Sequence, residues 1–312
     1  MALPANARGR ADAVTENTTP NVYNDKSYAY MYEKVKLLGI LDDQSSRLLN
    51  KPGNSIDLYK ETQWTVNPLV EGTDTPISPL VFDNEQLVLQ WYGDSKMISL
   101  ETLSEEFEFV FDRHLNRSAS FALGENKDIQ TLVEWANTTT PAIYPLNGSG
   151  VRLTSVTTPD GPTGSFQDEQ ASEARKQIIK AGRDTEDRYL IISPEQEKAL
   201  RDLPKFQSNE NYPATILIKG VIGVLHGFIV IVHRNVQTFA GTHVDTPTLY
   251  QAFAVTKDCS VYAQKVNPVY EFDRETKRAR TLTFLYHEAF GIKNLYDECI
   301  IPLVSNGDST AV

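Results

Sequence analysis

The densest group of residues that could do chemistry is a run of carboxylates between positions 101 and 112. Two carboxylates held close together can serve as a general acid and a general base. No motif for a nucleophile or a substrate pocket accompanies the run, and its spacing suits one long helix. We therefore interpret it as a solvated or intersubunit helix face, with Glu105 and Asp112 as candidates for pairing with basic groups of a neighbour. The members of the run are Glu101, Glu105, Glu106, Glu108 and Asp112.

The histidine, glycine and serine patterns match no metal, phosphate or nucleophile motif. A zinc site needs ligands at close spacing, and none of the five histidines has a His or Cys three or four positions away. Gly220, Gly223 and Gly227 lack the Lys-Ser or Lys-Thr of a phosphate loop, which favours turns between strands. Ser165 and Ser193 lack the glycines of a nucleophile elbow. The sequence therefore predicts no catalytic residue, no metal and no cofactor.

The two cysteines, Cys259 and Cys299, stand outside any metal-ligand spacing. Free cysteines are among the most buried residue types. We therefore predict two buried thiols, with a disulfide as the alternative.

The composition is that of an ordinary globular protein with an acidic balance. The chain has 312 residues, 40% of them hydrophobic and 23% charged, and a formal net charge of −11. Binding nucleic acid by neutralising its phosphates needs clustered Lys and Arg, so the charge argues against that mode but leaves enclosed nucleic acid open. No apolar run approaches the roughly 18 residues of a membrane span, and the N-terminus lacks the apolar stretch of a signal peptide. We expect no membrane partner.

The elements that would position these residues begin with a long, mostly polar β-hairpin and a long amphipathic helix. Apolar residues alternate from Ser55 onwards and again near Trp91, and turn-forming residues lie between them at 71–79. Helical spacing then predicts a helix over about 100–123, ended by Gly124, and a shorter helix beyond it. A hairpin with so little core is not stable alone in water. We therefore expect it to pack outside its own domain, which favours assembly over a catalytic pocket.

The remaining pattern mixes helical and strand periods, which predicts an α+β fold. In chain order the expected elements are a helix (27–41), a second short helix (127–135), a loop (138–168), a helix (168–181), a strand (188–193), a helix (194–203), buried strands joined by glycine turns (215–236), a helix or a strand (248–257), paired strands (260–276 and 278–288) and a last strand (292–304).

Five short segments complete the pattern: Val70-Glu71-Gly72, Met97–Leu103, Arg188–Pro194, Gly220–Val230 and Tyr286–Gly291. In this order they resemble the major capsid proteins of tailed bacteriophages, the Hong Kong 97-like family. The first is similar to the acidic-glycine turn of the family's extended loop, and the second to the start of its spine helix. The third resembles the strand, proline and short helix of the axial domain. The fourth resembles a strand pair of the family that is punctuated by glycines, and the fifth resembles the last peripheral strand region.

The resemblance implies a Hong Kong 97-like α+β fold with an N-terminal arm, an extended β-hairpin loop, a peripheral domain with a long spine helix, and an axial domain. The implied division is an arm (1–26), an N-terminal helix region (27–54), the extended loop (55–98), the peripheral domain with the spine helix (99–165), the axial domain (166–255) and a return to the peripheral strands (256–312). The assembly-contact candidates are Glu71, Gly72, Thr73 and Asp74 at the hairpin tip, with Glu105 and Asp112 on the helix.

The resemblance also implies a function without catalysis. Copies of the chain would form pentamers and hexamers and then an icosahedral shell around double-stranded DNA, in a virion assembled in the host cytoplasm. A separate scaffolding protein and a portal are the implied partners, and a decoration protein is left open. The alternatives are an encapsulin-like nanocompartment around protein cargo and, as a third class, a hydrolase that uses two acidic residues.

Overall fold

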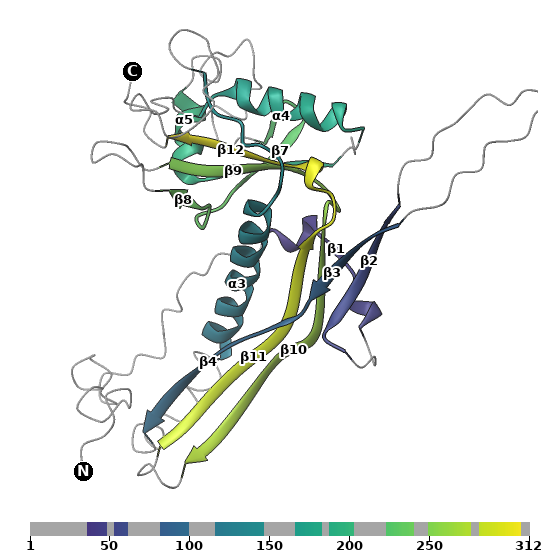
Figure 1. Ribbon diagram of the computed structural model, residues 1–312. Coiled ribbons are helices and arrows are strands. Elements are labelled where there is room, and N and C mark those ends of the chain that lie inside the picture. The colour runs from purple at the N-terminus through teal and green to yellow at the C-terminus, as the bar shows by residue number, and fades with distance from the viewer. Residues whose placement is uncertain are drawn as a thin grey trace, which may run out of the picture.

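The computed structural model describes residues 36–48, 53–61, 82–99, 116–146, 166–182, 187–202, 223–239, 249–275 and 281–306. These residues form two sheet units and a separate two-stranded hairpin (Figure 1). A six-stranded sheet with two helices lies at one end of the molecule, and a long four-stranded sheet with one helix extends away from it. The predicted α+β class is confirmed.

The six-stranded sheet has the order β12-β9-β5-β7-β6, with β8 pairing with β9. Its centre is β5, which pairs parallel with β7 and antiparallel with β9. Ile191 and Ile192 of β5 are buried, as expected for a central strand covered on both faces. The strands are β5 (Arg188–Ile192), β6 (Val224–Leu225), β7 (Phe228–Val232), β8 (Thr238–Phe239), β9 (Leu249–Thr256) and β12 (Ile300–Asn306).

Two helices flank this sheet, α4 (Asp168–Lys180) and α5 (Pro194–Asp202). The small buried residues Ala171 and Ala174 let α4 lie close to the sheet, where they join a core that includes Phe228. The predictions of a helix at 168–181, a strand at 188–193 and a helix at 194–203 are therefore confirmed within one or two residues.

The turn between β6 and β7 shows why glycine occurs in this apolar segment. Leu225 pairs with Phe228, so the turn has only two residues. They are His226 and Gly227, with φ angles of 49° and 85°. Positive φ at both positions is the geometry of a type I′ hairpin turn, which matches the twist of the strands it joins. The expected glycine turn is confirmed at Gly227, while Gly220 lies outside the described residues.

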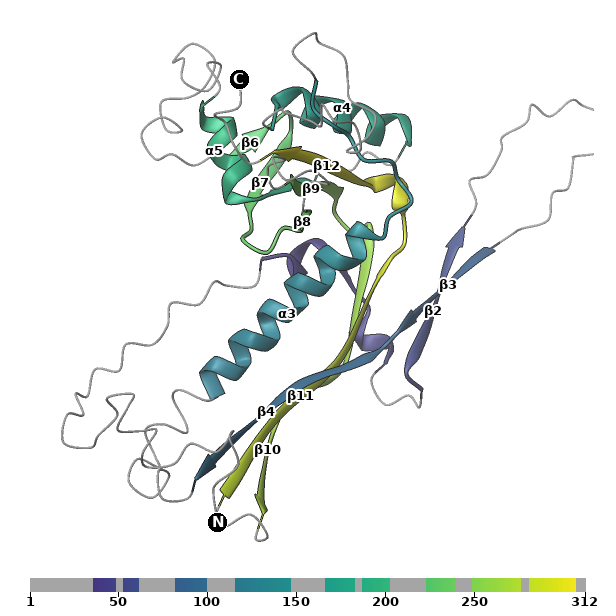
Figure 2. The same ribbon diagram turned by 60° about the vertical axis from the view of Figure 1, so that its left-hand side comes forward.

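The long sheet has the order β1-β10-β11-β4, and helix α3 (Asn116–Ala136) lies along one of its faces (Figure 2). The face toward α3 carries four buried side chains that alternate along β11, namely Phe284, Tyr286, Glu288 and Phe290. Among the described helices, none is long and apolar enough to span a bilayer. The strands are β1 (Asp42–Asp43), β4 (Gln90–Ser99), β10 (Ser260–Glu275) and β11 (Thr281–Asn294).

The hairpin consists of β2 (Ser55–Glu61) and β3 (Phe82–Val88), paired antiparallel. Its inner face holds Ile56, Leu58 and Leu87, which pack on Val261 and Ala263 of β10. The hairpin therefore has a core only where it rests on the long sheet.

Two predictions about the ends of elements need correction. The second strand of the predicted hairpin divides near Leu89: β3 pairs with β2, whereas β4 pairs with β11 of the long sheet. The predicted helix end at Gly124 is wrong, because α3 continues through it to Ala136. At the end of the described chain, β10 pairs with β11 in the long sheet, and β12 pairs with β9 of the six-stranded sheet.

Residues 248–257, for which the sequence left a helix or a strand open, contain strand β9. The side chains of β9 from Gln251 to Thr256 are all buried. The predicted arm (1–26) and most of the predicted first helix (27–41) lie outside the described residues; a short 3₁₀ helix, Leu38–Ile40, occupies the end of that range.

Candidate functional site

The two sheet units meet at a joint that helix α3 spans, and several buried polar groups lie there, among them Asp128, His233 and Glu288. Its apolar part joins Phe253 of β9 with Tyr262 and Phe290 of the long sheet, around the fully buried Trp135 of α3. Because one core contains residues of both units, the joint is packed rather than a hinge of exposed loops.

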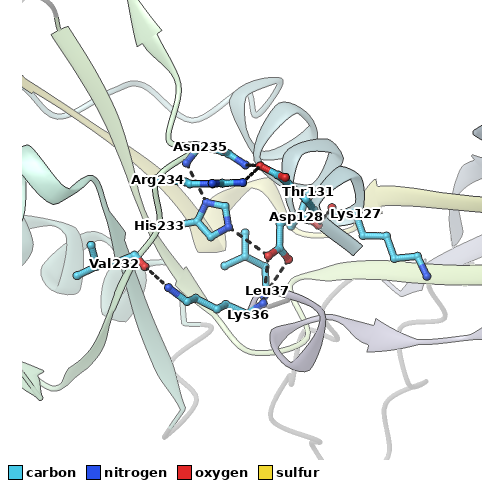
Figure 3. A network of polar contacts seen from close by, with 10 residues as sticks. Lys36, Leu37, Lys127, Asp128, Thr131, Val232, His233, Arg234 and Asn235 are labelled. Atoms are coloured by element: carbon cyan, nitrogen blue, oxygen red, sulfur yellow. Dashed lines mark hydrogen bonds and ion pairs between the residues drawn. The ribbon is translucent and has the colours of Figure 1, made fainter. Parts of the chain in front are cut away.

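Asp128 of α3 is the centre of one buried polar network (Figure 3). Its Oδ1 accepts the backbone N–H of Leu37 at 3.1 Å, and its Oδ2 accepts that of Lys36 at 3.1 Å. The third partner is Nε2 of His233, also 3.1 Å from Oδ2. A buried carboxylate with three donors is well compensated for its loss of water. Asp128 thus ties α3 to the segment at residue 36 and to the residue after β7.

The neighbours of His233 define its tautomer. Its Nδ1 accepts the backbone N–H of Asn235 at 3.2 Å, so the ring proton is on Nε2 and is donated to Asp128. The next residues extend the contact, because Arg234 and Asn235 both reach the carboxylate of Glu125 on α3, the amide at 2.8 Å. Lys36 adds a bond from Nζ to the Val232 carbonyl at 2.8 Å.

Lys127 precedes Asp128 and points away from that network, toward the long sheet (Figure 3). Its Nζ lies 2.9 Å from Oε2 of Glu288 on β11, whose side chain is completely buried. Gln264 bridges the pair, since its Oε1 accepts from Lys127 at 3.3 Å and its Nε2 donates to Glu288 at 3.2 Å. Burial raises the pKa of the Glu288 carboxyl, and the bond from Lys127 offsets only part of that rise.

The C-terminal end of α3 is attached by a second set of hydrogen bonds. The indole Nε1 of Trp135 donates to Ser260 Oγ at 2.9 Å, and that hydroxyl donates to Asn294 Oδ1 at 3.0 Å. Beyond the helix, Thr139 donates its backbone N–H and its hydroxyl to Asp297 Oδ2, at 3.2 and 2.8 Å. The chain leaving α3 is therefore bound to the chain that leads into β12.

A polar cleft of about 420 Å³ lies between the base of the hairpin and this end of α3. Lys293 is its central cation, 3.7 Å from Glu85 of the hairpin and 3.8 Å from Glu134 of α3. The lining contains no Ser, Cys or His that a base could activate, and the described residues contain no group of side chains placed to hold a metal. The cleft can carry ion pairs, because two lysines and four carboxylates line it.

Large apolar side chains are exposed on the hairpin and on the long sheet, among other places in the described part of the chain. On the outer face of the hairpin Tyr59, Phe82 and Val88 are 65%, 47% and 54% exposed, and the rings of Tyr59 and Phe82 are in edge contact. On the long sheet, Trp91 is 60% exposed, on the face opposite α3. Apolar groups gathered on an exposed strand pair are typical of surfaces that bind another protein.

The predicted contact residues cannot be placed. Glu71, Gly72, Thr73 and Asp74 at the hairpin tip, and Glu105 and Asp112 of the predicted helix face, all lie outside the described residues. The other carboxylates of the 101–112 run lie there too. These residues remain sequence predictions.

Sequence reasoning missed the buried charges at the joint. Glu288 had a signal: it alternates with Phe284, Tyr286 and Phe290, so it occupies an apolar position of a strand. Asp128 had none, because a carboxylate in a polar stretch of helix is usually solvated. The prediction for the cysteines is confirmed, since Cys259 and Cys299 are both buried and unbridged.

The arrangement of two sheet units, a helix along the long sheet and a projecting hairpin is the fold found in solved phage capsid structures. Among similar solved structures is one from Mycobacterium phage Che8, with a TM-score of 0.67, 15% identity, and coverage of 90% of this chain and 95% of that one. The head structure of Helicobacter pylori bacteriophage KHP40 gives 0.67 at 12% identity, over 94% and 98%. The capsid of Ralstonia phage GP4 gives 0.64 at 15% identity, over 93% and 96%.

No protein-family model and no curated protein matches the sequence. At these identities the similarity establishes the fold, and the predicted α+β class is confirmed as one that matches phage capsid structures.

Proposed function

We propose that this chain is the subunit of a tailed-phage capsid, which assembles as pentamers and hexamers into an icosahedral shell around double-stranded DNA. The observation that supports this most is the fold match, which covers at least 90% of both chains in the three structures described above. The proposal therefore assigns it a structural role and no reaction.

The fold supports an assignment of parts. The hairpin β2–β3 with residues 62–81 corresponds to the extended loop, and α3 to the spine helix. The long sheet corresponds to the peripheral domain and the six-stranded sheet to the axial domain. In this proposal β4, which pairs with β11, belongs to the peripheral domain, and β12, which pairs with β9, belongs to the axial domain.

The mechanism of assembly is burial of surfaces that the single subunit leaves in water. The outer hairpin face exposes Tyr59, Phe82 and Val88, although the hairpin has no core beyond its contact with β10. Covering such side chains stabilises a contact by about 25 cal/mol per Å² of apolar area. Modest contacts repeated around a closed shell then add up to high stability. The tip residues Glu71–Asp74 and the helix residues Glu105 and Asp112 are proposed to contact neighbouring copies.

The proposal extends to partners and location. A separate scaffolding protein and a portal would take part in assembly in the host cytoplasm, with the mature shell in the virion. The net charge of −11 supports a wall to which packaged DNA does not adhere, because phosphates and carboxylates repel each other. The shell would therefore enclose DNA without sequence-specific binding.

Deletion of residues 70–79 tests the role of the hairpin tip. We expect folded subunits with an unchanged far-ultraviolet circular dichroism spectrum that fail to form stable shells in electron micrographs. The matched control replaces the same ten residues by a Gly-Ser linker of equal length, which separates the loss of side chains from the loss of reach. Shells that form normally and resist heat as the parent does would refute this role.

A further inference from the structure

Adjacent residues of helix α3 are bound to different sheet units, and this division carries an inference that rests on the proposed shell function. Asp128 binds His233, which follows β7 of the six-stranded sheet. Lys127 binds Glu288 of β11 in the long sheet. Successive residues of an α-helix point about 100° apart, so one turn of α3 is attached to both units at once.

A second attachment lies further along the same helix. Trp135 binds Ser260, the first residue of β10, and is fully buried between the two units. Trp135 is eight positions after Lys127, or about 12 Å along the helix axis. Two attachment points on a rigid rod define its direction, whereas one would leave the helix able to swing about it. The contacts of Lys127 and Asp128, together with that of Trp135, therefore fix the direction of α3.

The Lys127–Glu288 pair is better suited to selecting one position of α3 than to stabilising the fold. Glu288 is completely buried, and its Oε1 has no hydrogen-bond partner among the described residues. Removing two charges from water costs several kcal/mol per ion, and an apolar pair of the same volume is often equally stable. A misplaced α3 would leave both charges buried and unpaired, which is a strong penalty against any other register.

We infer that Lys127 and Asp128 are positioning residues that fix the angle between the two sheet units, and through it the curvature and diameter of the shell. Small differences in this angle are multiplied when identical subunits repeat around a closed surface. A subunit with a loosened angle would still fold and still associate. It would close into shells of more than one size or into irregular particles.

The test compares the parent with Lys127→Met/Glu288→Leu, which removes both charges and approximately keeps their volume. A second variant, Asp128→Asn, keeps the side-chain shape but weakens the bonds to residues 36, 37 and 233. The matched control is Lys176→Met/Glu173→Leu, which removes an ion pair of 3.0 Å on the outer face of α4, where the lysine is 56% exposed. Each is measured by thermal unfolding and by the distribution of particle diameters in cryo-electron micrographs.

We expect the Lys127→Met/Glu288→Leu protein to unfold within about 4 °C of the parent, which corresponds to roughly 1 kcal/mol or a little more for a chain of this size. Its particles should show several diameters, and those of the control a single one. Lys127→Met alone should be clearly less stable, because it leaves Glu288 unpaired. A single parental diameter for both the double variant and Asp128→Asn would overturn the inference while leaving the shell function intact.

If the parent itself forms no shells, the proposed function fails and the angle is measured on the free subunit. Small-angle X-ray scattering of the double variant should then show a broader distribution of interatomic distances than the parent and the control. Identical curves for all three would overturn the inference in that case as well.

Discussion

Glu288 is completely buried with one carboxylate oxygen that has no hydrogen-bond partner in the described structure, and its titration gives a direct test of the buried pair. Burial raises its pKa above the usual value of 4.5. Between pH 4.5 and the raised pKa, the folded protein therefore retains a proton that the unfolded chain has already released. Its contribution to stability is fully present below that interval and is lost as the pH rises through it.

The prediction is a pH-dependent difference between the parent and Glu288→Gln, which cannot titrate. The melting temperature of the parent minus that of the variant should fall as the pH is raised from 4.5 to 7. The measurement is differential scanning fluorimetry of both proteins in matched buffers. A difference that stays constant, or grows with pH, would show that Glu288 is not held in the environment described.

The cysteines give a second prediction at this scale. Burial raises the pKa of the Cys259 thiol to about 12, and Cys299 is equally enclosed. Because the thiolate is the reactive form, neither should react with iodoacetamide at pH 8 in the folded protein. Mass spectrometry should find both alkylated only after unfolding in urea. Alkylation of the folded chain within minutes would contradict the burial of these side chains.

For single residues, the sequence could predict the properties that depend on residue type and on nearby residues. Buried thiols and the absence of metal and nucleophile motifs follow from residue type and spacing, so they could be stated in advance. The partners of Asp128 could not, because they lie 91 to 105 positions away in the chain. Burial of a single carboxylate is a property of the whole fold.

At the scale of elements, the crossing of the hairpin over the long sheet depends on one glycine. A Cβ at Gly291 of β11 would lie 2.6 Å from the carbonyl oxygen of Val88 and 2.9 Å from Leu87 Cδ2. The first contact is with backbone, which cannot rotate away. Gly291 therefore permits the hairpin to lie directly on β11.

Gly291→Ala should destabilise the protein by about 1–3 kcal/mol, the usual cost of overpacking. Hydrogen exchange of the amides in β3 should become faster, because the hairpin must lift from β11. Gly223→Ala serves as the control, since a Cβ there would meet nothing within 4 Å. Unchanged stability and unchanged exchange in the Gly291 variant would contradict this crossing.

Helix α3 shows why local signals predict the existence of an element better than its ends. Gly124 suggested a stop, because glycine is favoured just past a helix and costs roughly 1 kcal/mol within one. The buried residues Leu123, Leu132 and Trp135 lie on both sides of it and pack into the joint and the sheet. Their burial outweighs the cost of one glycine. Likewise, the exchange of partners between β3 and β4 has no local signal, because it depends on where β11 lies.

At the scale of the whole molecule, the order of elements carried more information than any single motif. Each of the five segments that carried the resemblance is short, yet their order along the chain predicted the fold that the structure has. The pairing of β12 with β9 had no such signal, because the chain returns to the six-stranded sheet through the joint. Which unit a strand joins is decided by long-range pairing, which periodicity alone does not encode.

The central claim is that this chain builds a shell, and cryo-electron microscopy of the purified full-length protein tests it most directly. The account predicts closed icosahedral particles made of pentamers and hexamers, with the hairpin of each subunit lying on a neighbour. Double-stranded DNA of genome length inside particles from infected cells would support the capsid, and protein cargo would point to a nanocompartment instead. A protein that stays a stable monomer at high concentration, above all one with hydrolase activity, would contradict the account.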